Sequence, residues 1–379
     1  MILENPIPIV TEKELNFNSI VLYMDLDAFF ASVEIREQPK LKGLPIIIGG
    51  DPITKRGVVS TCSYEARKFG IHSGMPISQA LKLCPEVKII KSTHGLYSKV
   101  SKNIMKIIGY YSPKIKVSGV DEAYLDIIDI VSDYEEAEKL AYELKDDIYA
   151  SEKITCSIGL APNKILAKIA SGVDKPDGLK IVKPFEIVDF LAPLKISIIP
   201  GVGKKSEISF NKEGVYTCGD LKSLSLSKVV HNLGKSGLRL WKLVNGYNTE
   251  EMSDDKFSKR DRKSISDERT FFNPLSKWQD VWYYLNDSIK TIVSSAQKKN
   301  MQYRTITLKI RFRNFKTDTR SHTIPCYCND EMNVRDAIKK LLFEYKDVKP
   351  SEIRLIGVKI SNIRKITCEQ RTLEKFFNK

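Results

Sequence analysis

The stretch VSGVDEAYLDI, residues 117–127, places two adjacent acids, Asp121 and Glu122, inside an otherwise apolar run. A buried carboxylate is costly unless a cation or hydrogen-bond donors accompany it, so a strand core should not tolerate this pair. A second apolar run, LYMDLDAFF at residues 22–30, carries Asp25 in the same way. Each acid alone is explained by a strand end or a lysine partner. Together the three acids favour one common site.

Neighbouring residues on a flat strand point to opposite faces of a sheet. Asp121 and Glu122 therefore reach one site only if the backbone turns just before them, near Ser118 and Gly119. Gathered carboxylates repel one another and favour a cation between them. Oxygen ligands without histidine or cysteine suit Mg²⁺, which takes its remaining ligands from water and phosphates. The pattern predicts a magnesium–phosphate site, and Asp27 is left outside it because the strand need not continue that far.

The chain of 379 residues is long enough for two to four domains, and its 42% hydrophobic content is enough for real cores. No apolar run approaches the roughly 18 residues of a membrane span, and the extension at residues 1–18 lacks the pattern of a secretory signal. The seven scattered cysteines favour reduced thiols in a cytoplasmic protein over disulfides or a zinc site.

The net charge of +14 is unevenly distributed along the chain. Residues 251–379 hold 28 Lys and Arg against 17 Asp and Glu, a net charge of +11. This C-terminal third is therefore the expected polyanion-binding part.

From residue 19 to 183 the expected strands and helices alternate, which fits an α+β sheet with helices on one face. Asn163 is the expected N-cap of one helix, and Lys164 and Lys168 are expected on its solvated or DNA-facing side. Residues 184–247 instead indicate short helices around a Gly-Val-Gly turn.

The last part of the chain follows a polar, pattern-free linker at residues 248–264. In YRTITLKIRFR, residues 303–313, apolar side chains alternate with threonine, lysine and arginine. This period of two predicts a strand with one face on a core and one basic face. A similar pattern at residues 354–365 predicts a second strand. Basic residues without a row of aromatic residues favour contact with a nucleic-acid backbone over contact with bases.

Five segments resemble, in order and in register, the motifs of Y-family translesion DNA polymerases of the DNA polymerase IV type. They are YMDLDAFFASVE (23–34), STCSYEARKFGIHSGMP (60–76), SGVDEAYLDI (118–127), SIGLAPNKILAKIASGVDKPDGL (157–179) and IPGVGKK (199–205). The resemblance implies low-fidelity, template-directed addition of dNMP from dNTP to a primer 3′ end, with lesion bypass and without proofreading. It also implies two Mg²⁺ ions, primer-template DNA as partner, and a monomer without membrane association.

The implied fold is an α+β multidomain, right-hand polymerase. Its expected parts are a mixed-sheet palm (19–29 and 94–183), small fingers (30–93), a helical thumb with a helix-hairpin-helix (184–247), and an α+β little finger that binds DNA (265–367).

The resemblance also implies a role for each matching residue. Asp25, Asp121 and Glu122 match the catalytic and metal-binding acids, and the Leu26 carbonyl contacts one ion. The implied nucleotide contacts are Phe29, Phe30, Thr61, Tyr64, Arg67 and Lys175. Phe30 matches the gate that excludes ribonucleotides, although ordinary core packing is the alternative that the residues alone favour. The implied DNA contacts are Gly201, Gly203, Lys204, Lys309, Arg311 and Arg313.

The expected clamp-binding tail is residues 368–379, and its stretch EQRTLEKFFNK contains Gln370, Leu373, Phe376 and Phe377 at the spacing of a sliding-clamp peptide. Such a peptide inserts aromatic side chains into a pocket of the clamp. The tail resembles those of archaeal or eukaryotic clamp partners, and the alternative is a terminal helix that folds onto its own domain.

Two other functions remain as alternatives. A nucleotide cyclase can use a similar palm, and GGD at residues 49–51 resembles one cyclase motif, but a cyclase has no use for a basic C-terminal third. A non-catalytic DNA-binding scaffold on the clamp would not need all three acids.

Overall fold

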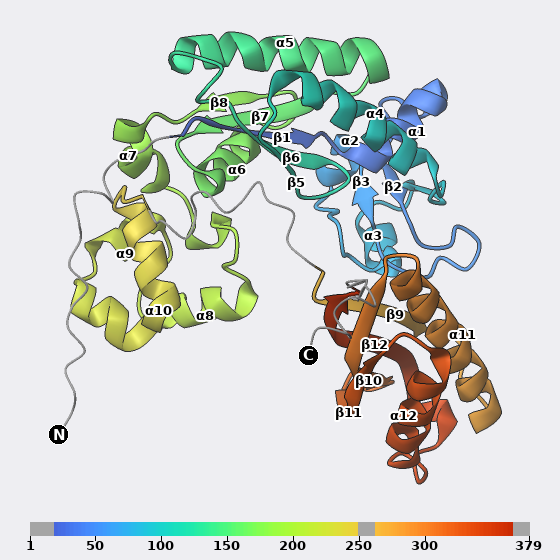
Figure 1. The fold of residues 1–379 in the computed structure, drawn as a ribbon. Helices are drawn as coiled ribbons and strands as arrows, with labels where there is room; N and C mark the ends of the chain where they lie inside the picture. The colour runs from blue at the N-terminus through green and yellow to red at the C-terminus, as the bar shows by residue number, and fades with distance from the viewer. Residues whose placement is uncertain (1–18, 249–261, 367–379) are drawn as a thin grey trace, which may run out of the picture. The chain divides into compact units, whose positions relative to one another are not determined.

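The computed structural model describes residues 19–248 and 262–366 (Figure 1). The chain divides into two compact units, Met1–Lys259 and Arg260–Lys379. The expected N-terminal extension, residues 249–261 of the expected linker and the clamp peptide with Gln370, Leu373, Phe376 and Phe377 lie outside the described residues. Among the described residues, no helix is both long and apolar enough to cross a membrane.

The first unit is built on a five-stranded sheet with the order β5-β6-β1-β7-β8. Its strands are β1 (Val21–Leu26), β5 (Ile115–Val117), β6 (Glu122–Asp126), β7 (Cys156–Ala161) and β8 (Leu179–Ile181). The central strand β1 pairs antiparallel with β6 and β7, whereas β7 and β8 are parallel. The strand that carries Asp25 therefore lies beside the strand that begins at Glu122.

Helices cover both faces of this sheet, so the prediction of helices on one face was wrong (Figure 1). Leu22 and Met24 pack with α4 (Leu96–Tyr111) and α5 (Tyr134–Glu152). Val21 and Tyr23 pack on the other side with α6 (Lys164–Val173). Because consecutive residues of β1 are apolar and point to alternate faces, both faces need a covering layer.

A small second sheet with the order β3-β2-β4 follows β1 in the chain. It consists of β2 (Ile46–Ile48), β3 (Thr61–Cys62) and β4 (Lys88–Ile90). Three helices accompany it: α1 (Phe29–Glu37), α2 (Tyr64–Arg67) and α3 (Ile77–Leu83). A 3₁₀ turn, Pro39–Leu41, follows α1. Ser63 caps α2 by accepting a hydrogen bond from the Ala66 N–H, which fixes where the helix with Tyr64 and Arg67 begins.

The rest of the first unit is helical, as the sequence predicts. It contains 3₁₀ turns at Pro184–Glu186 and Ile196–Ile198 and the helices α7 (Ile187–Leu191), α8 (Lys204–Lys212), α9 (Cys218–Ser223) and α10 (Leu226–Val244). Gly201 has φ +99° in the turn that precedes α8, a conformation that favours glycine. Gly234, with φ +61°, interrupts the helical geometry of α10.

The second unit is an antiparallel sheet with the order β11-β10-β12-β9. Its elements are β9 (Ser264–Thr270), α11 (Trp278–Gln297), β10 (Met301–Phe312), β11 (Thr317–Cys328), α12 (Glu331–Phe343), a 3₁₀ turn (Pro350–Glu352) and β12 (Ile353–Lys365). Ile306, Leu308 and Ile310 are fully buried in a core shared with both helices, which confirms the two-residue period of β10. The sequence pattern did not predict the strands β9 and β11, because apolar and polar residues do not alternate regularly in them.

Candidate active site

The register of β1 and β6 sets the positions of the predicted acids. Asp25 lies opposite Glu122 in the antiparallel pair. Asp121 precedes the strand, and its carbonyl accepts a hydrogen bond from the Leu26 N–H at 2.9 Å. The N–H groups of Ser118 and Gly119 both point to the Glu122 carbonyl, at 3.1 and 3.3 Å. The predicted turn before the acid pair is therefore confirmed.

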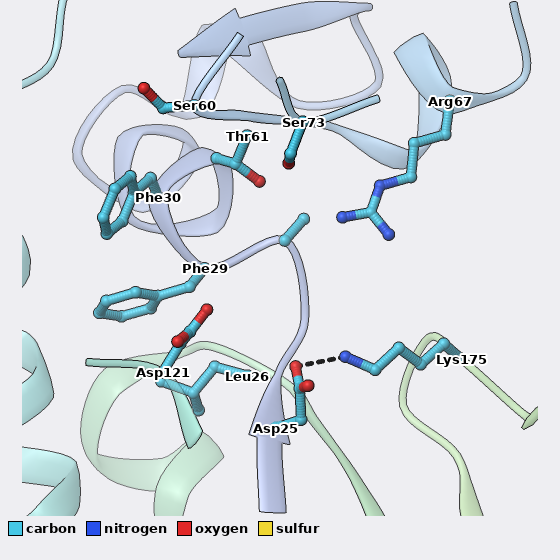
Figure 2. A pocket seen from close by; sticks show the side chains of 11 residues that line it. Asp25, Leu26, Phe29, Phe30, Ser60, Thr61, Arg67, Ser73, Asp121 and Lys175 are labelled. Atoms are coloured by element: carbon cyan, nitrogen blue, oxygen red, sulfur yellow. Dashed lines mark hydrogen bonds and ion pairs between the residues drawn. The ribbon is translucent and has the colours of Figure 1, made fainter. Parts of the chain in front are cut away.

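Asp25 and Asp121 line one open pocket of about 170 Å³, which has room for several water-sized groups (Figure 2). Of the residues predicted to contact metal or nucleotide, the pocket brings together Asp25, Leu26, Phe29, Phe30, Thr61, Arg67, Asp121 and Lys175. Ala28, Ser60 and Ser73 also line the pocket, and of these three the sequence did not predict Ser60 and Ser73. In Figure 2 the Arg67 guanidinium and the Thr61 and Ser73 hydroxyls extend toward the central space. Hard anionic oxygens thus face donors suited to phosphate across one cavity.

Glu122 does not line this pocket, although it was predicted beside the other two acids. Its carboxylate forms an ion pair with Lys168 of α6 and accepts a hydrogen bond from the Tyr23 hydroxyl. Burial alone raises the pKa of Glu122, but the hydrogen bonds from Lys168 and Tyr23 outweigh it and hold the pKa below its usual value. Lys168 is 32% exposed and lies against the sheet as well as solvent, because α6 packs directly against β1 and β7. That this side of α6 faces DNA stays a prediction.

Asp25 and Asp121 differ in how their charges are compensated. Lys175 donates to Asp25 in an ion pair (Figure 2). Asp121 forms no ion pair with any residue of 19–248 or 262–366. Burial raises the pKa of the Asp121 carboxyl, and the charge of Asp25 raises it further. Of the three acids, Asp121 is therefore the one whose charge the described residues compensate least.

A metal site can be tested against this donor set. Among the described residues, no group of three His, Cys, Asp or Glu side chains is close enough to hold an ion by itself. Two carboxylates in an open pocket beside Leu26 nevertheless fit Mg²⁺, which needs few protein ligands when water and phosphate oxygens complete its shell. The residues fit a cation shared with a phosphate ligand, and they do not form an all-protein cage.

Asp27, which was left outside the site, is 1% exposed and is the centre of a hydrogen-bond network. Its carboxylate accepts from the hydroxyls of Ser157 at 2.8 Å and Thr155 at 2.9 Å, and from the Asp177 N–H at 2.8 Å. The Tyr64 hydroxyl also donates to it, at 3.2 Å. Polar residues at Thr155 and Ser157 in an apolar strand were the sequence signal for this buried acid.

Tyr64 and Phe30 have partners that bear on their predicted roles. Tyr64 does not line the pocket; its ring lies 4.6 Å below the Arg67 guanidinium, which it supports by a cation–π contact. Phe30 lines the pocket and also stacks on Tyr97, with ring centroids 4.1 Å apart. Phe30 therefore packs against the core with its ring and also forms part of the pocket wall, so the two interpretations do not exclude each other.

The residues predicted to contact DNA lie in two places. Gly201, Gly203 and Lys204 form the turn and the start of α8 in the first unit. In the second unit, Lys309 lies 2.8 Å from Glu268 in an ion pair. Arg311 donates to the Thr317 hydroxyl at 2.8 Å, and Arg313 donates to the Ser351 carbonyl at 2.7 Å.

Comparison with known proteins covers nearly the whole chain. The impB/mucB/samB family matches residues 24–172, and the C-terminal domain of the same family matches residues 262–373. DNA polymerase IV 2 of Methanosarcina mazei is 41% identical over 96% of this chain and 98% of its own length. The chain belongs to the DNA polymerase IV family. DNA polymerase IV of Methanoculleus marisnigri is 40% identical over 95% of this chain and 98% of its own length.

Solved structures agree with this assignment. A Y-family DNA polymerase chimera of Dbh and Dpo4 has a TM-score of 0.79 and 31% identity, and covers 92% of this chain and all of its own. DinB from Sulfolobus solfataricus has a TM-score of 0.59 and 30% identity over the same shares. The chain is thus a DNA-directed DNA polymerase of the Y family with an α+β multidomain fold, and the cyclase and scaffold alternatives are set aside.

Proposed function

We propose that Asp25 and Asp121, with the Leu26 carbonyl, hold the divalent cations of a translesion polymerase, two Mg²⁺ ions per site. The supporting observation is that both carboxylates face one pocket together with Arg67 and Lys175. When bound, Mg²⁺ at such a site activates a primer 3′-hydroxyl and neutralises charge on the leaving pyrophosphate.

The chain's own residues bind and orient the incoming dNTP in this proposal. Arg67 offers a planar pair of N–H donors to phosphate oxygens, and the Thr61 hydroxyl adds another donor. Lys175 exchanges its contact with Asp25 for a phosphate when the triphosphate arrives. Phe29 and Phe30 form the wall against the sugar, where the Phe30 ring leaves no room for a 2′-hydroxyl.

The proposal assigns the parts of the hand as well. The five-stranded sheet with α4, α5 and α6 is the palm, the small sheet is the fingers, and the helices of residues 184–247 are the thumb. The turn at Gly201 and Gly203, with Lys204, presents backbone N–H groups to a DNA phosphate. The second unit is the little finger, and the family member whose structure is titled an insertion ternary complex of Dbh polymerase supports binding of DNA and nucleotide together. A monomer in the cytoplasm stays a prediction.

Primer extension with Mg²⁺ and each single dNTP tests the function. The wild type should extend a primer by the templated base, and Asp25→Asn or Asp121→Asn should abolish extension while leaving the affinity for primer-template DNA in place. Asp129→Asn is the matched control, because the side chain of this acid is 69% exposed and, among the described residues, pairs only with Lys114 at the surface. Normal extension by Asp121→Asn would show that this carboxylate does not hold the cations.

A further inference from the structure

Four side chains form a block on the α6 side of the sheet. The register pairs Tyr23 with Tyr124 and Asp25 with Glu122 across β1 and β6. Residues two apart on one strand share a face, so the two tyrosines and the two acids lie together. The Tyr23 and Tyr124 rings are 4.6 Å apart, and the Tyr23 hydroxyl lies 3.2 Å from Asp25 Oδ2. Tyr23 is fully buried and bridges the two acidic positions.

Lys168 of α6 contacts two of these four side chains, Tyr23 and Glu122. Its Nζ donates to both the Tyr23 hydroxyl and Glu122 Oε2, and it lies 4.6 Å from the centre of the Tyr23 ring. Gly159, the partner of Tyr23 on β7, makes this approach possible: a Cβ at that position would lie 2.0 Å from the Ala167 carbonyl. The absence of a side chain at Gly159 thus lets α6 press Lys168 onto the acids.

Both donors use the same carboxylate oxygen of Glu122. Tyr23 and Lys168 contact Oε2, and no residue of 19–248 or 262–366 donates a hydrogen bond to Oε1. Glu122 is half-buried, with 24% of its side chain exposed, and the two donors fix the orientation of its carboxylate through Oε2 alone. An acid held by one oxygen is oriented and keeps the other available.

We propose that Tyr23 and Lys168 are positioning residues that fix Glu122 by Oε2 and leave Oε1 for the reacting primer end and its cation. This inference rests on the proposed polymerase function. Lys168 also supplies a fixed positive charge, so Glu122 attracts a free cation less strongly than Asp121, which forms no ion pair among the described residues. Lys168 therefore favours the catalytic orientation of the Glu122 carboxylate but lowers the affinity of the site for a divalent cation.

The experiment measures single-turnover extension, giving the rate at saturating dNTP and the dNTP concentration at half-maximal rate. Tyr23→Phe should lower the rate about tenfold, and Lys168→Met about 100-fold, with half-saturation changed less than twofold. Lys168→Arg should restore part of the rate. Tyr124→Phe is the matched control and should behave as wild type. It removes a neighbouring phenolic hydroxyl that makes no hydrogen bond to Asp25 or Glu122.

Binding of Mn²⁺ alone, followed by electron paramagnetic resonance on the full chain without DNA, gives a second readout. Lys168→Met should tighten Mn²⁺ binding several-fold while extension falls, because a competing charge is lost. Loss of both Mn²⁺ binding and thermal stability would show a purely structural role and overturn the proposal. Wild-type rates in Tyr23→Phe and Lys168→Arg, should Lys168→Met fail to fold, would also overturn it. Normal Lys168→Met beside inactive Asp121→Asn would defeat this inference alone and leave the proposed function intact.

Discussion

The carboxylate of Asp27 accepts a hydrogen bond from the backbone N–H of Asp177, 2.8 Å away and 150 residues later in the chain. The same carboxylate holds Tyr64 of α2 by its hydroxyl. One buried acid therefore ties the loop that carries Lys175, and the helix that carries Arg67, to the end of β1. Both cationic residues of the pocket depend on a residue that does not itself line it.

Asp27→Ala should weaken nucleotide binding more than it weakens DNA binding. The change leaves the donors of Thr155, Ser157 and Asp177 without an acceptor, which should lower the free energy of unfolding by about 3 kcal/mol. The half-saturating dNTP concentration in primer extension should rise about tenfold, because Lys175 and Arg67 lose their common support. Asp129→Ala, at an exposed position, is the control. An unchanged half-saturation in folded Asp27→Asn would limit Asp27 to a structural role.

Phe30→Ala should admit ribonucleotides. The Phe30 ring stacks on Tyr97, so it is held in one place at the pocket wall. Removing the ring should raise the ratio of rNTP to dNTP incorporation on the order of 100-fold, because a 2′-hydroxyl then no longer clashes with the Phe30 side chain. Phe30→Tyr keeps the ring and should keep the discrimination. Single-nucleotide extension with matched rNTP and dNTP measures both variants. An unchanged ratio in Phe30→Ala would show that Phe30 does not select against ribonucleotides.

The sequence predicted the strands and acids of the site because chemistry and periodicity agree there. An acid such as Asp25 in an apolar strand is conspicuous, and a resemblance in register placed Arg67 and Lys175 beside it. The hydrogen-bond network of Asp27 and the ion pair of Lys168 were not predicted for one physical reason: elements far apart in the chain make both environments. Whether a lysine on a helix meets solvent or a buried acid depends on which face packs on the sheet. That choice is set by Gly159 on another element.

Gly159→Ala should destabilise the first unit strongly. The new methyl would lie 2.0 Å from the Ala167 carbonyl and 2.6 Å from the Ser171 N–H, so α6 must move away from β7. Overpacking of this kind costs about 3 kcal/mol or more in the free energy of unfolding. Gly172→Ala in the same helix meets open space and should stabilise by about 0.5–1 kcal/mol. Chemical denaturation of both variants checks the contrast, and equal stabilities would contradict it.

Glu268→Gln should tighten DNA binding, and Lys309→Ala should weaken it. Lys309 reaches Glu268 across Gly357, where a Cβ would lie 2.7 Å from the Glu268 Cγ. In the proposed function Glu268 therefore competes with DNA phosphates for the charge of Lys309. Lys309→Ala should reduce the slope of log affinity against log salt by about 1, equally for all sequences. Fluorescence anisotropy of a labelled primer-template over a salt series measures both, and an unaltered slope would show that Lys309 serves only the ion pair.

Deletion of residues 369–379 should abolish stimulation by a sliding clamp and leave distributive synthesis intact. The predicted peptide uses Gln370, Leu373, Phe376 and Phe377, and the last strand of the described fold, β12, already ends at Lys365. Phe376→Ala with Phe377→Ala removes the two aromatic anchors without shortening the chain, and should reproduce the deletion. Lys375→Ala is the control, since it changes the same segment at a position that the motif leaves variable. Extension of a circular primed template with and without the clamp separates the outcomes. Loss of distributive synthesis in the double variant would mean that the tail folds onto its own domain instead.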